Sequence, residues 1–243
     1  VSYTPSITAL AALEARSRAR ASATPFLVAL GDPAIGAAAS TTAKADDQRR
    51  GTAARLPEPA REVRALGRLY GANRSSVLVA DEATEAALRE QLKRATVVHV
   101  ATHGVLDDKN PMYSHLMLTP APGADHTTDG RLEAWELLDL EITAKLAVLS
   151  ACQTAGGSRF GEGVIGLSWS LFAAGASTAV VSQWEVDSTS TTSLMIAFHE
   201  QLLKPGSTVT SPEALRQAAL TVLKNPAYRH PFYWAGFISV GTR

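Results

Sequence analysis

The chain has 243 residues, of which 46% are hydrophobic, so it can bury one sizeable core without covalent staples. The chain has 23 basic residues (Lys plus Arg) and 23 acidic residues (Asp plus Glu). It therefore lacks the net positive charge expected of a protein that binds nucleic acid or an anionic membrane directly. The single cysteine cannot form an internal disulfide, no leader-like segment opens the chain, and no apolar run approaches the roughly 20 residues of a membrane-spanning helix. We therefore expect a cytoplasmic protein. Because the first residue is Val1, we also expect a fragment of a longer polypeptide.

Apolar periodicity alternates between helix and strand spacing in the first hundred residues. Proline, glycine or aspartate bounds the short apolar runs, which is typical of buried strands. Residues 34–54 lack such periodicity, and we expect them to form a mobile loop. The expected elements are a helix over 6–20, a strand over 26–30, a helix over 57–71, a strand over 75–80, a helix that Asp81 or Thr84 caps and that ends near Arg94, and a strand over 96–104.

Prolines and glycines interrupt the alternation over residues 105–131, which we expect to form a second mobile segment with a short strand over 116–120. The elements expected after it are a helix near 133–140, a strand over 146–152, a helix over 164–174, a strand over 177–186, helices over 190–203 and 212–224, and a last strand over 233–241. Strands that alternate with helices of about 10 to 15 residues predict parallel βαβ units. We therefore expect one α/β domain over 1–243, with a central, mostly parallel sheet covered on both faces.

One histidine and the single cysteine each stand at the carboxyl end of a predicted strand. His103 ends the strand over 96–104, and Cys152 ends the strand over 146–152. Chemistry gathers at this edge of a parallel sheet. If the two strands are neighbours, the imidazole can take the thiol proton, and the thiolate can attack a carbonyl. The separation of 49 residues agrees with the spacing of about 50 between the histidine and the cysteine of caspases. The sequence therefore predicts His103 as the general base and Cys152 as the nucleophile.

Two residues near this pair affect the prediction. Gly104 lacks a side chain, so its amide can approach a tetrahedral intermediate and form an oxyanion hole with the amide of Cys152. His99 competes with His103 because both face one side of the strand, but we expect His99, in mid-strand, to be packed in the core. The alternative reading of the pair is a small buried cysteine and a satisfied core histidine.

Other kinds of site lack the residues they need. Zinc spacings such as CxxC, HxxH and HExxH do not occur, so we predict no metal site. The glycine-rich loop after Cys152 carries Glu162 where a phosphate-binding loop requires lysine. The segment around Ser168 lacks the second glycine of a serine-hydrolase elbow. We therefore expect no cofactor.

The segment "SQWEVDS" follows the strand after the cysteine and carries two acidic residues. We expect Glu185 and Asp187 at the end of this strand, with side chains two apart on one face, where they can line a pocket for a basic substrate residue. Solvated carboxylates, or a helix cap at Asp187 or Ser188, explain the same pattern equally well.

Several segments resemble the CHAT domains, bacterial relatives of caspases and separase that are often fused to tetratricopeptide repeats. The similarity runs from near residue 5 to the end of the chain and is most specific in "VVHVATHG" and "LAVLSACQTAGG". Gln153 stands where many members carry glutamate. The resemblance implies a caspase-like three-layer α/β/α sandwich and a dyad at His103 and Cys152. Separase carries similar acids beside a tryptophan, which are associated with a basic residue before the scissile bond. By this resemblance the substrate-binding residues are Asp187 first and Glu185 second, beside Trp184 and Gln183.

The resemblance also implies an activity and a partner. We expect a cysteine endopeptidase that cleaves a protein substrate and is gated by an upstream tetratricopeptide-repeat module or an activator protein. Two alternatives remain open, a non-catalytic interaction module of the same fold and a thiol-dependent acyl transferase. If the chain is an interaction module, the substitution Cys152→Ala would not change its function. If it is a transferase, the reaction would leave a modified acceptor.

Overall fold

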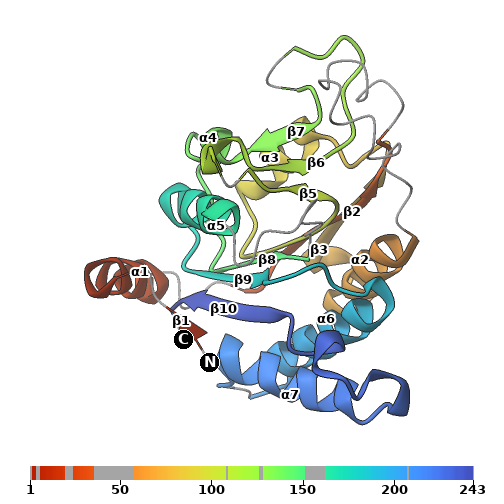
Figure 1. Cartoon of the computed structure of the whole chain (residues 1–243). Helices are drawn as coiled ribbons and strands as arrows, with labels where there is room; N and C mark the ends of the chain where they lie inside the picture. The colour runs from red at the N-terminus through yellow and green to blue at the C-terminus, as the bar shows by residue number, and fades with distance from the viewer. Residues whose placement is uncertain are drawn as a thin grey trace.

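The computed structural model describes residues 2–3, 6–19, 24–35, 57–107, 109–125, 128–150, 162–206 and 208–242. A seven-stranded sheet in the order β1-β10-β9-β8-β4-β2-β3 runs through its centre (Figure 1). Its strands are β1 (Ser2–Tyr3), β2 (Leu27–Pro33), β3 (Ser75–Ala80), β4 (Val97–Ala101), β8 (Leu146–Leu149), β9 (Thr178–Ser182) and β10 (Phe237–Gly241).

The sheet is mostly parallel, as the sequence predicts. Strands β3, β2, β4, β8 and β9 pair in parallel, whereas β10 runs antiparallel to β9 and pairs in parallel with β1. Every residue of β2, β8 and β9 is buried. Helices on both faces account for this burial, and it explains why these strands are continuous apolar runs rather than alternating ones.

Helices cover both faces of the sheet, so the expected three-layer sandwich is confirmed. Helices α1 (Ile7–Ala19), α3 (Glu85–Leu92), α4 (Ala134–Leu137) and α5 (Glu162–Ala174) lie on one side, and α2 (Pro57–Tyr70), α6 (Ser188–Leu203) and α7 (Ser211–Leu223) lie on the other (Figure 1). Strand β8 shows the division, because Ala147 and Leu149 belong to the same core cluster as Leu171 of α5, whereas Leu146 and Val148 cluster with residues of α6 and α7. None of the described helices is both long and apolar enough to cross a membrane.

A second, three-stranded sheet lies beyond the end of β4. It contains β5 (Gly104–Val105), β6 (His115–Met117) and β7 (Arg131–Glu133), all antiparallel. Residues 105–131 therefore hold regular structure, and the strand expected over 116–120 begins one residue earlier and ends at Met117. Most of the other segment expected to be mobile, 36–54, lies outside the described residues.

Four strands are shorter than predicted. The strand expected over 96–104 ends at Ala101, and the strand expected over 146–152 ends at Leu149. Strand β9 ends at Ser182, so the expected strand over 177–186 is wrong beyond that residue. The last strand begins at Phe237 rather than at Tyr233, because Tyr233 ends a 3₁₀ helix that starts at Pro231, and residues 234–236 form a turn and a bend. Gly236 lies in this bend, where a glycine weakens the strand pattern.

Candidate active site

The strands that lead to the predicted dyad are direct neighbours. Strand β4 pairs in parallel with β8, with Val97 opposite Leu146 and Val100 opposite Leu149. The residue numbers of each pair differ by 49, which is also the separation of His103 and Cys152. Pairing extends past the strand ends, because the amide of Ser150 donates to the carbonyl of Val100 over 2.8 Å. The order and register of the strands are therefore those that the dyad requires. Cys152 itself lies outside the described residues.

His103 stands two residues beyond the end of β4 and is 7% exposed. Two hydrogen bonds fasten this turn to the second sheet. The amide of Met117 donates to the carbonyl of His103 over 2.8 Å, and the hydroxyl of Thr102 donates to the carbonyl of Met117 over 2.6 Å. The next residue, Gly104, opens β5 opposite Leu116. Hydrogen bonds to the second sheet thus fix the position of the backbone at His103, the predicted base. The role of Gly104 in an oxyanion hole stays a prediction.

His99 is packed in the core, as expected, and belongs to a chain of buried polar side chains that the sequence analysis missed. Its Nε2 lies 2.6 Å from Oε1 of Glu62, and its Nδ1 lies 3.2 Å from Nε2 of His199. Nδ1 of His199 lies 3.0 Å from the hydroxyl of Tyr70. The four residues are at most 1% exposed. They connect α2, β4 and α6, and their separation in sequence hides the cluster from motif analysis.

With Glu62 ionised and both histidines neutral, every member of this hydrogen-bonded chain has a partner. A carboxylate can only accept, so Nε2–H of His99 donates to Glu62. Nδ1 of a neutral His99 then accepts from Nε2–H of His199, whose Nδ1 accepts from the hydroxyl of Tyr70. Burial, and then the neighbouring His99, hold the pKa of His199 well below its ordinary range. The stability that neutral His199 contributes is therefore present above its unfolded pKa of about 6.5 and is lost as the pH falls below it.

The predicted substrate-binding segment is a bend rather than a strand. Because β9 ends at Ser182, the expectation that Glu185 and Asp187 share one strand face is wrong. Asp187 caps α6, and its Oδ1 accepts the amide of Ser190 over 2.8 Å. Glu185 is exposed. The helix-cap alternative is therefore confirmed for Asp187, and a role of either acid in binding substrate stays a prediction.

Trp184 and Gln183 are both fastened to the turn that precedes β10. The amide of Gln183 donates to the carbonyl of Gly236 over 2.7 Å, and Nε1 of Trp184 donates to the carbonyl of Phe232 over 3.3 Å. A Cβ at position 236 would approach Nε1 of Trp184 to 3.3 Å and Cγ1 of Val186 to 2.7 Å, so glycine permits this close packing. The turn before β10 thus positions the segment that follows β9. Within the described parts of the chain, no three His, Cys, Asp or Glu side chains are grouped to hold a metal ion.

Solved structures of cysteine proteinases share this architecture. The Arg-specific cysteine proteinase gingipain R matches with a TM-score of 0.55 and 11% sequence identity, over 89% of this chain and 46% of gingipain R. The separase of Saccharomyces cerevisiae, solved in complex with securin, matches with a TM-score of 0.57 and 12% identity, over 99% of this chain and 14% of separase. At these identities the similarity shows the fold, which is a caspase-like α/β sandwich.

The sequence places the chain in a family within this class. A model of the CHAT domain matches residues 1–242, and the chain belongs to the CHAT domain family. Tetratricopeptide repeat protein 28 of Mus musculus is 34% identical over 111 residues, which cover 46% of this chain and 4% of the mouse protein. Tetratricopeptide repeat protein 28 of Homo sapiens is 29% identical over 68% of this chain and 8% of the human protein. The chain thus corresponds to a small part of these two relatives.

Proposed function

We propose that this chain is a cysteine endopeptidase domain in which His103 activates Cys152. The observation that carries the proposal is the pairing of β4 with β8, whose register offset equals the separation of the two residues. A parallel sheet brings the carboxyl ends of neighbouring strands together, and both residues follow such ends. His103 does not belong to the buried cluster around His99, in which His99 contacts Glu62 and His199.

The proposed reaction follows from the chemistry of a thiol beside an imidazole. His103 accepts the proton of the Cys152 thiol, and the thiolate attacks the carbonyl carbon of a peptide bond. Backbone amides of Gly104 and Cys152 hold the oxyanion. His103 then protonates the leaving amine, which leaves a thioester on Cys152. A water molecule, deprotonated by His103, hydrolyses the thioester, releases the carboxylic acid and restores the thiol. No cofactor enters this sequence of steps.

The proposed substrate is a polypeptide, and the proposed control lies outside this domain. The mouse and human relatives are named for tetratricopeptide repeats, and this chain covers only 4% and 8% of them. The yeast separase was solved with a protein partner, securin. We propose on these grounds that a repeat module or a partner protein gates the domain, and that the protein works in the cytoplasm. Asp187 and Glu185 remain the proposed acids that favour a basic residue before the cleaved bond.

Amino-terminal sequencing tests whether peptide bonds are cleaved without requiring a known substrate. A peptide library made from a digested proteome, with its amines blocked, is incubated with the wild-type chain or with Cys152→Ala. New amino termini are expected only with the wild type, because the variant lacks the nucleophile, and arginine is expected before the cleaved bond, since amine blocking also modifies lysine. The same library is also incubated with a longer protein that includes the upstream region. Cleavage by the longer protein but not by this chain would support gating. Acylated acceptors in place of new termini would instead identify a transferase.

A further inference from the structure

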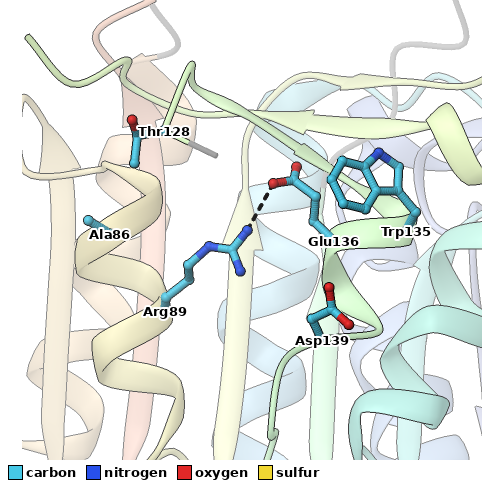
Figure 2. A pocket seen from close by; sticks show the side chains of 6 residues that line it. All are labelled: Ala86, Arg89, Thr128, Trp135, Glu136 and Asp139. Atoms are coloured by element: carbon cyan, nitrogen blue, oxygen red, sulfur yellow. Dashed lines mark hydrogen bonds and ion pairs between the residues drawn. The ribbon is translucent and has the colours of Figure 1, made fainter. Parts of the chain in front are cut away.

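A cavity of 280 Å³ lies between α3 and α4, apart from the predicted dyad (Figure 2). None of the residues that line it is a predicted site residue, and they are Ala86, Arg89, Thr128, Trp135, Glu136 and Asp139. Drug-sized ligands occupy pockets of about 300–1,000 Å³. The cavity is therefore sized for a small group such as one side chain.

Negative charge exceeds positive charge around this cavity. Arg89 donates to Oε1 of Glu85 over 2.6 Å and to Oε1 of Glu136 over 3.0 Å, so one guanidinium serves two buried carboxylates. Figure 2 shows Arg89 and Glu136 meeting across the hollow, with Asp139 on the α4 side below them. No salt bridge joins Asp139 to any residue that the structure describes. Two carboxylates, those of Glu136 and the exposed Asp139, thus line the cavity with one cation, and a third carboxylate, that of Glu85, pairs with the same cation.

Glu85 shows that this charge is incompletely balanced. Its side chain is 1% exposed, and its Oε2 is buried without a hydrogen-bond partner among the described residues. Burial, opposed by the hydrogen bond from Arg89 and reinforced by the charge of Glu136, raises the pKa of Glu85 to about 7. An additional positive charge nearby would favour its ionised form.

An aromatic side chain forms one wall of the cavity. Trp135 is 37% exposed, and its Nε1 donates to Oε2 of Glu133, which fixes the orientation of the indole. Leu138, three residues further along at the end of α4, is 46% exposed, and this spacing puts it on the same side of the helix as Trp135. The face of an indole attracts ammonium and guanidinium groups, and carboxylates add charge pairing. The indole of Trp135 and the carboxylates of the cavity therefore both favour a cationic ligand.

We propose that this cavity binds an arginine side chain of a partner polypeptide, with an apolar neighbour of that arginine packed on Leu138. The guanidinium stacks on Trp135 and pairs with Asp139. A planar guanidinium suits this combination better than an ammonium, because it stacks and forms paired hydrogen bonds at once. The cavity is then a docking site for a protein segment, separate from the residues at which peptide cleavage is proposed.

Nuclear magnetic resonance of the four tryptophan indole groups tests the proposal in the Cys152→Ala chain, so that cleavage cannot interfere. The probe is acetyl-Leu-Arg-amide, and acetyl-Leu-citrulline-amide is the uncharged control of the same shape. Trp135→Phe assigns the indole signal of Trp135. We expect this signal to shift and saturate with a dissociation constant on the order of 1 mM, equivalent to about −4 kcal/mol. The citrulline peptide is expected to bind at least about fivefold more weakly, since it lacks the charge.

Two variants complete the test. Asp139→Asn is expected to weaken binding about fivefold or more, because it removes a carboxylate that faces the cavity while keeping the shape of the side chain. Glu90→Gln, on the exposed surface of the same helix α3, is the matched control and is expected to leave binding unchanged. Equal binding of the two peptides, no effect of Asp139→Asn, or a shift confined to Trp184 would overturn the proposal. The last result would assign the peptide to the predicted active site instead.

Discussion

Glu62→Leu is expected to lower the free energy of unfolding by about 1 to 3 kcal/mol. The carboxylate accepts the Nε2–H of His99 over 2.6 Å in a site where both side chains are at most 2% exposed. Leucine cannot accept this hydrogen bond, so a polar nitrogen would remain buried without a partner. The loss extends further, because the proton arrangement of His199 and Tyr70 depends on that of His99. Urea unfolding at pH 7.5 measures the difference.

Two further variants separate the hydrogen bond from other effects. Glu62→Gln keeps an oxygen that can accept from His99, and its loss is expected to be about 1 kcal/mol. Glu90→Leu, at an exposed glutamate of α3 paired with Lys93, is expected to unfold close to the wild type. If Glu62→Leu is as stable as Glu90→Leu, the buried chain does not stabilise the fold.

His103→Ala is expected to lower the rate of peptide cleavage by about a thousandfold, within the 10²–10⁴ that general acid and base catalysis contributes. Alanine can neither take the thiol proton nor protonate the leaving amine, so both halves of the proposed reaction slow. The measurement is the initial rate on a peptide identified by amino-terminal sequencing. His230→Asn is the matched control, since His230 is an exposed histidine whose Nδ1 caps a 3₁₀ helix, and asparagine can serve the same cap. A His103→Ala chain as active as His230→Asn would exclude His103 as the base.

Much of the fold could be predicted because its strands and helices differ in period. Continuous apolar runs such as Ala147 to Leu149 are buried on both faces, which marks them as central parallel strands. The helix over Pro57–Tyr70 was predicted from its three-residue steps and ends one residue before the glycine assigned to close it. Strands β1, β5 and β7 were missed, since two or three residues carry no measurable alternation.

The residue at which β9 ends could not be predicted, because the pattern of apolar residues does not show where the backbone hydrogen bonds to a neighbouring strand stop. Val186 and Trp184 continue the hydrophobic run, but after Ser182 the backbone pairing with the turn before β10 ends at the amide of Gln183. The bend beyond it places Asp187 at the start of α6 as a cap. Predicting that two acids share a strand face therefore failed at the point where tertiary contacts replaced sheet pairing.

The meeting of the β4 and β8 strand ends was predictable for a different reason. A parallel sheet with neighbouring β4 and β8 brings strand ends together whatever the side chains are, so position along the chain was enough to propose His103 and Cys152 as a dyad, which stays a prediction. The hydrogen-bonded side chains of Glu62, His99, His199 and Tyr70 could not be predicted as a cluster. They come from α2, β4 and α6, which are far apart in the sequence. The cavity beside Trp135 was missed likewise, since it depends on how α3 meets α4.

The rate of Cys152 alkylation against pH, in the wild type and in His103→Ala, tests the dyad most directly. The chain contains one cysteine, so the reagent reports a single thiol and needs no substrate. If His103 activates Cys152, the wild type reacts well below the free-thiol pKa of about 8.5, and the variant loses this reactivity at low pH. Two curves that coincide near 8.5 would contradict the proposed dyad.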